Sequence, residues 1–220
     1  AVGMSPNGRL LVTGSFDSSL NLWDATTGKK QLQYADHHSQ ELNSIAFSSD
    51  GKRMASCSWA RLNVWETATG KQVSGISQLV GYTSVALHND LLLAGTQEND
   101  AQLWDISTAK QVRTLVGHTE RIWGTAFNAN GKLACTTSGD GTTRLWRVSD
   151  GRELVRLINF DQSGEWLAIT PDGRFDGSQD IGKLITYRDQ ESGRLMDADQ
   201  LPGGFHLKGA LMKRFVPNDE

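Results

Sequence analysis

An aromatic residue recurs along this chain at nearly constant spacing. Its successive members, separated by 42, 39, 42 and 41 residues, are Trp23, Trp65, Trp104, Trp146 and Tyr187. A turn that ends in a small residue and a basic residue follows each aromatic, at Gly28-Lys29, Gly70-Lys71, Ala109-Lys110, Gly151-Arg152 and Gly193-Arg194. A hairpin-type turn precedes each aromatic, at Pro6-Asn7-Gly8, Ser49-Asp50-Gly51, Asn89-Asp90, Asn130-Gly131 and Pro171-Asp172-Gly173. Three landmarks that keep step through five copies indicate a tandem repeat of about 40 residues.

The segment 110–147 shows the internal organisation of one repeat most clearly. Its short apolar runs, VRTLV, IWGTAF, LACTTS and TTRLW, have the length and the β-branched or aromatic content of strands, and polar turns separate them. Asn130-Gly131 predicts a tight hairpin turn with positive φ at both of its central residues. Each repeat is therefore predicted to be a four-stranded antiparallel meander. A period of about 40 residues with four strands per unit is typical of β-propeller blades, so we expect an all-β propeller.

The landmarks divide the chain into five predicted blades and a tail. The blades comprise residues 1–35, 36–78, 79–117, 118–159 and 160–198, and the tail comprises residues 199–220. Because residues 1–5 align with residues 44–48 in the middle of a predicted strand, we expect further blades upstream and a ring larger than five. In the tail, Leu207, Leu211 and Phe215 follow an i, i+4, i+8 pattern, which predicts a short helix or a linker.

Composition and charge argue against several classes of function. A net charge of −3 over 220 residues provides no electrostatic basis for binding nucleic acid or an anionic membrane. No apolar run approaches the ~20 residues that span a bilayer. Cys57 and Cys135 fall inside predicted strands without metal-ligand spacing, which predicts buried free thiols and a cytoplasmic protein. No phosphate-binding glycine loop is present, so we expect no cofactor and no small-molecule substrate. His37 and His38 would point to opposite sides of a strand, so we expect no metal site.

Copy four combines four residue types that suggest chemistry, His118, Thr136, Asp140 and Trp146. A catalytic triad would use Thr136 as nucleophile, His118 as base and Asp140 as the orienting acid. The indole–acid pairs, the Gly-His before a first strand and the Asp six residues before the Trp make the chain resemble the WD-repeat family over about 200 of its 220 residues. That resemblance implies a buried structural relay instead, in which indole, hydroxyl, imidazole and carboxylate satisfy one another. We favour the relay and expect no enzyme activity.

The other copies keep only parts of this relay. The members that remain are Thr13, Asp17 and Trp23 in copy one, and His38, Ser56 and Trp65 in copy two, which lacks the Asp. Copy three has Ala94 and Glu98 in place of the hydroxyl and the Asp, and copy five has Tyr187 in place of the Trp. A repeated active site would not decay in this way, whereas a repeated stabilising device can. Copy four is therefore predicted to be the most stable blade, and copies three and five the least.

Exposed aromatic and arginine side chains indicate a binding surface. Phe16 and Trp59 occupy equivalent turns between predicted strands, and Arg61 lies near Trp59. Trp123 lies one residue into a first strand, beside Arg121. In WD-repeat rings such positions line the face that binds partners, and Trp and Arg often anchor interfaces. The alternative is local packing of both indoles. The resemblance implies a non-catalytic scaffold that binds a protein partner or another domain of its own polypeptide.

Copy five carries a more specific resemblance. The run GEWLAITPDGRFDGSQD, residues 164–180, is similar to the closing blade of bacterial WD-repeat proteins associated with caspase-like peptidases. The alternative function is therefore a regulatory propeller of such a peptidase, whose catalytic domain lies outside this chain, because no caspase-type Cys or His motif occurs here. An enzyme with its site in the central channel is a third hypothesis. Small apolar residues in the first strands argue against it, namely Ala46, Ala86, Ala126 and Ala168.

Overall fold

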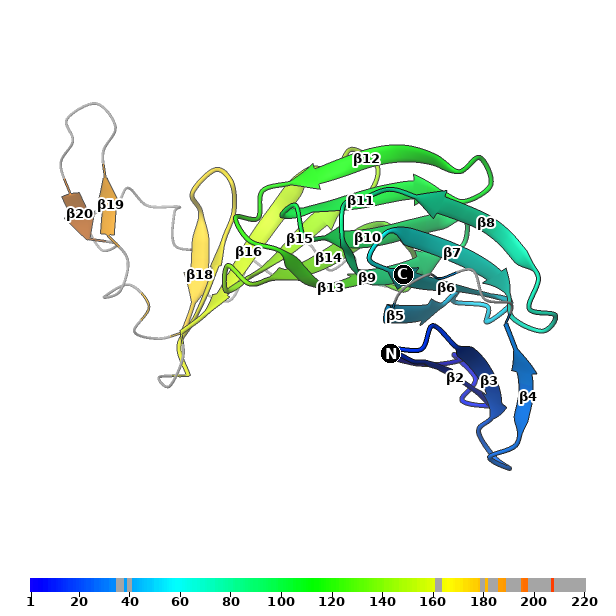
Figure 1. Cartoon of the computed structure of the whole chain (residues 1–220). Helices are drawn as coiled ribbons and strands as arrows, with labels where there is room; N and C mark the ends of the chain where they lie inside the picture. Colours follow the sequence, from blue (N-terminus) through cyan, green and yellow to red (C-terminus); the bar gives the residue numbers. More distant parts are fainter. Residues whose placement is uncertain are drawn as a thin grey trace. The chain divides into compact units, whose positions relative to one another are not determined.

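The computed structural model describes residues 1–34, 38, 41–160, 164–178, 181, 186–188, 195–197 and 207. These residues form an almost entirely β-stranded fold, as predicted, and they fall into two compact units (Figure 1). The first unit comprises residues 1–140 and 147–152, and the second comprises residues 141–146 together with those from 153 onward. The helix predicted in the tail lies outside the described residues, except for Leu207.

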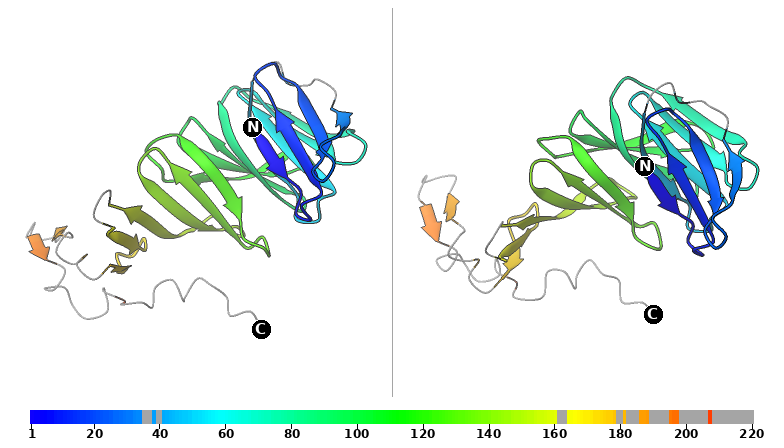
Figure 2. Two further views of the ribbon diagram at one scale, coloured as in Figure 1. Left: turned by 90° about the horizontal axis from the view of Figure 1, so that it is seen from below. Right: turned by 60° about the horizontal axis from the view of Figure 1, so that its bottom comes forward.

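The first unit contains three four-stranded antiparallel meanders and a hairpin (Figures 1 and 2). Sheet one consists of β1 (Val2–Met4), β2 (Leu10–Gly14), β3 (Leu20–Asp24) and β4 (Lys30–Gln33). Sheet two consists of β5 (Leu42–Phe47), β6 (Arg53–Ser58), β7 (Arg61–Glu66) and β8 (Gln72–Ser77). Sheet three consists of β9 (Tyr82–His88), β10 (Leu91–Thr96), β11 (Asp100–Asp105) and β12 (Lys110–Val116). The hairpin pairs β13 (Ile122–Phe127) with β14 (Leu133–Ser138).

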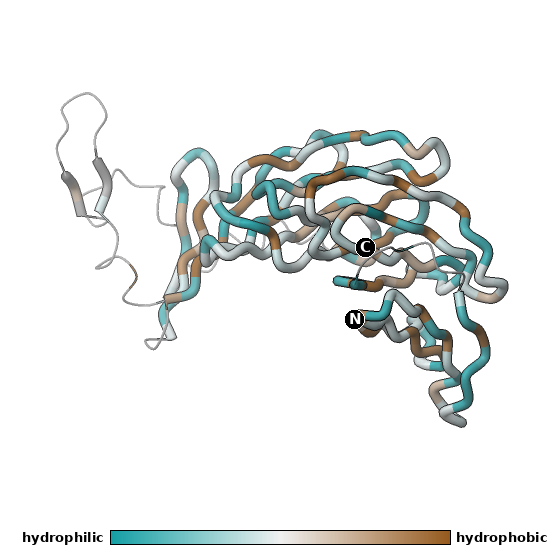
Figure 3. Tube along the Cα trace, viewed as in Figure 1, coloured by the Kyte–Doolittle hydropathy of each residue, from teal (hydrophilic) through white to brown (hydrophobic). Residues whose placement is uncertain are grey.

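Sheet two is covered on both faces by its neighbours. Met54 and Trp65 pack with sheet one, where the Trp65 and Tyr34 rings meet edge-on with centroids 5.6 Å apart. Ala55 and Val64, their neighbours along the chain, pack with sheet three. Because successive side chains of a strand point to opposite faces, burial of both faces explains why β6 and β7 are buried at almost every position. Figure 3 shows the apolar segments concentrated on the strands.

The meanders place their connections at two opposite ends of the first unit. We call turn end the end formed by the connections between first and second and between third and fourth strands. We call loop end the end formed by the second-to-third connections and by the links between sheets. Backbone hydrogen bonds join the two turn-end connections of a sheet, for example from Thr67 N to Lys52 O at 2.8 Å. Figure 1 shows the β3–β4, β7–β8 and β11–β12 turns along one side.

The turns after the repeated aromatics share one backbone conformation. Gly28, Gly70 and Gly151 have φ angles of 67°, 72° and 73°. Ala109 adopts the same left-handed conformation, with a φ of 54°. A Cβ atom disfavours this region, so the third copy holds a strained residue where the others have glycine.

The tight turn predicted at Asn130-Gly131 is wrong in one respect. Only Gly131 of the pair has positive φ, at 69°. The connection is wider than two residues, because Asn128 Oδ1 accepts a hydrogen bond from Leu133 N at 3.0 Å and Asn128 O accepts one from Gly131 N at 3.0 Å. A side chain that caps the loop therefore replaces the two-residue turn.

The second unit differs from the meander of a complete repeat. Residues 142–146 of β15 (Thr142–Arg147) pair with β16 (Glu153–Asn159), and β16 also pairs with β17 (Trp166–Ile169). β17 pairs with β18 (Phe175–Gly177), and β19 (Thr186–Arg188) pairs with β20 (Leu195–Asp197) as a separate two-stranded sheet. Copy five thus extends the open edge of β16 instead of closing a four-stranded sheet among the described residues. Its β18 has only three residues. An edge strand exposes unpaired backbone groups to which another strand can bind, and a short edge strand exposes few of them.

The two cysteines differ in burial. Cys57 is fully buried, as predicted, and burial raises the pKa of its thiol to about 12, which keeps it in the unreactive protonated form. Cys135 is only half-buried, so the prediction of two buried thiols is wrong for this residue. Both cysteines are free. In the part of the chain that the structure describes, no helix has the length and apolar character needed to cross a bilayer.

Candidate functional site

The residues of copy four that suggested a catalytic triad form a buried contact set. His118 precedes β13, Thr136 lies in β14 and Asp140 follows β14. The imidazole Nδ1 lies 2.9 Å from Asp140 Oδ2, and its Nε2 lies 2.8 Å from Thr136 Oγ1. Asp140 Oδ2 also accepts a hydrogen bond from Thr119 N at 3.1 Å. Thr136 is only 1% exposed, so a substrate could not reach its hydroxyl, and Trp146, in the second unit, is buried too.

Copy one contains the inner half of the same arrangement. Trp23 Nε1 donates a hydrogen bond to Thr13 Oγ1 at 2.9 Å. Asp17 is exposed and caps its own turn, because its Oδ1 accepts a hydrogen bond from Ser19 N at 2.9 Å. Hydrogen bonds from the Ser19 backbone and side chain lower the pKa of the Asp17 carboxyl.

Copy two contains a fourth member, Ser58, that the sequence pattern did not reveal. His38 Nε2 lies 2.8 Å from Ser56 Oγ, which accepts a hydrogen bond from Trp65 Nε1 at 2.8 Å. Its Nδ1 lies 2.9 Å from Ser58 Oγ, so a serine hydroxyl stands where copy four has a carboxylate. The available signal was spacing, since Ser56 and Ser58 point to the same face of one strand. We call His38, Ser56, Ser58 and Trp65 the sheet-two clasp.

Copy three has no such arrangement. Trp104 is only 4% exposed, yet its Nε1 has no hydrogen-bond partner. Ala94, which replaces the hydroxyl-bearing residue of the other copies, is fully buried and offers no acceptor. Glu98 is exposed at the loop end. The pattern of residue types alone predicted this difference between the copies.

The aromatic residues predicted as partner anchors lie exposed at the loop end of the first unit. Phe16 is 84% exposed, Trp123 55% and Trp59 43%. The Arg121 guanidinium carbon lies 4.0 Å from the centroid of the Trp123 ring, so the two side chains are stacked. Arg61, the first residue of β7, is also exposed.

Backbone hydrogen bonds hold these loops in place. Trp59 O accepts a hydrogen bond from Tyr82 N at 3.0 Å, and Ala60 O accepts one from Gln78 N at 3.0 Å. Leu79, in the connection between these two donors, is 85% exposed and therefore adds an apolar side chain that the sequence analysis did not single out. The loop end thus presents exposed apolar groups on a hydrogen-bonded backbone.

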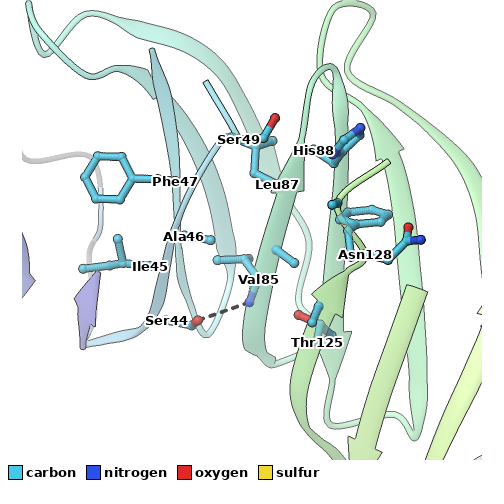
Figure 4. A pocket seen from close by; sticks show the side chains of 14 residues that line it. Ser44, Ile45, Ala46, Phe47, Ser49, Val85, Leu87, His88, Thr125 and Asn128 are labelled. Carbon is cyan, nitrogen blue, oxygen red and sulfur yellow. Dashed lines mark hydrogen bonds between the residues drawn. The ribbon is translucent and has the colours of Figure 1, made fainter. Parts of the chain in front are cut away.

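The inner face of the first unit carries a hollow of about 500 Å³ (Figure 4). Its walls are the innermost strands β5, β9 and β13, and Ala46, Ala86 and Ala126 lie at equivalent positions along it. His88 is the one titratable side chain among the lining residues. A single imidazole does not provide the acid–base pair that hydrolytic chemistry uses. Across the described ranges, no three His, Cys, Asp or Glu side chains gather as a metal site would require.

Comparison with protein families agrees with this geometry. The profile of the WD domain, G-beta repeat, matches three segments of the chain, residues 1–24, 28–66 and 109–147. These segments contain the repeated tryptophans of copies one, two and four. Most of copy three, including Trp104, whose indole N–H has no hydrogen-bond partner, lies outside them. The repeat matches and the four-stranded sheets support a WD-repeat β-propeller.

This chain aligns with only part of each similar protein. Pre-mRNA-processing factor 19 homolog 2 of Arabidopsis thaliana is 28% identical over 73% of this chain and 33% of its own length. The guanine nucleotide-binding protein subunit beta of Oryza sativa subsp. japonica is 28% identical, over 69% and 44%. Nuclear distribution protein nudF of Aspergillus niger is 25% identical, over 68% and 39%. The chain therefore spans from a third to somewhat under half of the length of these plant and fungal relatives.

Proposed function

We propose that this chain is a non-catalytic scaffold, acting in the cytoplasm, that binds a protein partner through the loop end of the first unit. Phe16, Trp59, Arg61, Arg121 and Trp123 would provide the anchors. Relatives that include a G-protein subunit and a pre-mRNA-processing factor support an interaction role, and the buried His118 set speaks against catalysis.

The observation that carries this proposal is the position of Trp123. It is the second residue of its first strand, as Asn43 and Thr83 are of theirs. Asn43 Nδ2 donates a hydrogen bond to Tyr82 O at 2.7 Å and so links sheet two to sheet three. Thr83 Oγ1 donates one to Ile122 O at 2.5 Å and so links sheet three to the β13–β14 hairpin. At the third equivalent position an exposed indole replaces the polar link.

Stacking prepares Trp123 for binding. The planar Arg121 guanidinium lies against the indole, which restricts both side chains before a partner arrives. Preordered side chains lose less rotamer entropy on association, a cost of about 0.5–1.5 kcal/mol for each one that binding would otherwise immobilise. Trp and Arg are also the residue types that most often dominate binding energy.

Quantitative affinity purification tests the proposal. Trp59→Ala and Trp123→Ala should each reduce recovery of the same partner by at least about tenfold, as expected for hot-spot residues. Val112→Ala is the matched control, because Val112 is 47% exposed on β12 but does not lie at the loop end. If both tryptophan variants retain every partner that the wild-type chain captures, the proposed surface is misplaced.

The alternative, a regulatory propeller of a bacterial caspase-like peptidase, stays a prediction. It rests on the resemblance of residues 164–180, of which 164–178 include β17 and β18. Sequencing the complete gene decides this alternative, because a peptidase domain in the same reading frame is its direct consequence.

A further inference from the structure

Basic residues of the first unit are concentrated at its turn end. Thirteen Lys and Arg lie among the described residues of this unit, so an even distribution would place six or seven at each end. Eleven lie at the turn end: Arg9, Lys29, Lys30, Lys52, Arg53, Lys71, Lys110, Arg113, Lys132, Arg147 and Arg152. Two lie at the loop end, Arg61 and Arg121.

The acidic residues that the structure describes in the same unit are evenly divided. Six lie at the turn end: Asp24, Asp50, Glu66, Asp90, Asp105 and Asp150. Six lie at the loop end: Asp17, Glu41, Glu98, Asp100, Glu120 and Asp140. Eleven positive against six negative charges leave the turn end at +5, and two against six leave the loop end at −4. The two charges add to only +1, and the net charge of −3 for the whole chain does not reveal the separation.

The carboxylates at the turn end serve the turns themselves. Asp24 Oδ1 accepts hydrogen bonds from Thr26 N and Thr27 N at 2.9 and 2.7 Å, and Asp105 Oδ1 accepts one from Ser107 N at 2.8 Å. Such bonds explain why acids occur there. These turn hydrogen bonds do not account for the lysines, most of which are exposed at the tips of successive sheets.

The turn ends of neighbouring sheets form one continuous surface. Arg53 Nη1 contacts Asp90 Oδ1 at 2.5 Å between sheets two and three. Arg113 Nη2 donates to Ser149 O at 2.5 Å, which links sheet three to the next turn. The basic residues are therefore spread over a broad end surface and not along a single groove.

We infer that the turn end binds the surface of a bilayer that contains anionic lipids. A broad anionic plane can attract all of these cations together, and each Lys or Arg near such a surface contributes about 1 kcal/mol. None of the large apolar side chains that are exposed in the described residues lies in a turn-end connection. Single-stranded nucleic acid would favour aromatic groups for base stacking, which this surface does not offer. The association is electrostatic, reversible and sensitive to salt.

The charge separation also orients the first unit. With the turn end on the membrane, the acidic loop end and its exposed tryptophans face away from the lipid. Membrane binding and partner binding then use opposite ends, so a failure of one does not entail a failure of the other.

Vesicle co-sedimentation of the full chain tests this inference. Vesicles of phosphatidylcholine with phosphatidylserine should bind the chain, and vesicles of phosphatidylcholine alone should not. The double variant Lys71→Glu with Lys110→Glu should reduce binding on the order of tenfold or more, because it reverses two charges at the surface. Arg61→Glu with Arg121→Glu changes the net charge equally but at the loop end, and it should retain vesicle binding.

Three results would overturn the inference. The first is equal binding to neutral and anionic vesicles, and the second is an equal loss in both double variants. The third is tighter binding of a nucleic acid duplex or of polyglutamate than of anionic vesicles at the same salt concentration, which would assign the surface to another polyanion. Circular dichroism and urea midpoints identical to those of the wild-type chain establish that the exposed substitutions leave the fold intact.

Discussion

Sheets two and three have the same topology and pack against each other, yet their polar interiors differ. Sheet two buries a complete clasp, in which Trp65 Nε1, Ser56, His38 and Ser58 contact one another in sequence. Sheet three buries Trp104 with an indole N–H that has no partner. Sheet three therefore forms by apolar packing without such a clasp.

The apolar core explains how sheet three tolerates the unpartnered indole. Trp104 packs with Tyr82, Leu92 and Ile106 in a buried cluster that also includes residues of sheet two. An unsatisfied buried donor costs about 1–3 kcal/mol, which a cluster of this size can offset. We therefore interpret the clasp as a tie between His38 and the strands of sheet two, and not as a requirement for folding.

The largest effect is expected from His38→Ala in sheet two. The change leaves a cavity and removes the partner of the Ser56 and Ser58 hydroxyls, so the free energy of unfolding should fall by about 3 kcal/mol. Urea denaturation measures the loss. His88→Ala is the control, because His88 is only half-buried, and it should cost less than about 1 kcal/mol. Equal losses would show that the clasp adds nothing beyond the histidine itself.

Removing the serine hydroxyl from sheet two and introducing one into sheet three should change the stability of the chain in opposite directions. Ser56→Ala leaves Trp65 Nε1 and His38 Nε2 without this partner and should destabilise the chain by about 1–3 kcal/mol. Ala94→Ser should place an acceptor near Trp104 Nε1, as Thr13 does for Trp23 with the same spacing, and stabilise it by about 0.5–1 kcal/mol. Thermal unfolding of both variants tests the pair, and a destabilising Ala94→Ser would contradict the interpretation of the orphaned indole.

The turn after each aromatic provides a smaller contrast. Ala109→Gly in sheet three should stabilise the chain by about 0.5 kcal/mol, because glycine accepts the positive φ without steric strain. Gly70→Ala in sheet two should destabilise it by about 1 kcal/mol or more. There, the new Cβ would also lie 2.8 Å from a methyl carbon of Leu32. Denaturation midpoints rank the two variants, and the same sign for both would refute the argument.

The smallest effect concerns pH. Hydrogen bonds from the Ser107 side chain and the Thr108 backbone hold the pKa of Asp105 below its ordinary value of 3.8. The folded state therefore gains stability from the ionised carboxylate above that value and loses it as the pH falls through the lowered pKa. Asp105→Asn should flatten the acid limb of a plot of urea midpoint against pH. Glu66→Gln is the control at the equivalent position of sheet two, and parallel curves for wild type and Asp105→Asn would contradict the prediction.

Much of the fold could be predicted from local patterns. The regular spacing of the aromatics indicated the repeats. The short apolar runs located the strands, because a strand pattern depends on residues close in the chain. Residue types also predicted that copy three lacks the hydroxyl that Trp104 Nε1 would contact. Ser58 escaped prediction, since its contact with His38 joins residues 20 positions apart through a link before the first strand. The pairing of β17 with β16 was not predicted either. It depends on β16 having an open edge in the folded chain, which no local sequence pattern encodes.

Local patterns were enough to predict the four-stranded meanders of residues 1–116, because side-chain alternation and turn residues act locally. The sequence also determined where the aromatic and arginine residues stand in each repeat. What those positions do together depends on how the repeats pack. The tertiary structure paired the serine of one strand with a distant histidine, left Trp123 exposed where its counterparts link sheets, and gathered basic residues from seven turns at one end. Such properties arise because chain folding brings residues of separate repeats onto common surfaces, where their charges and contacts add.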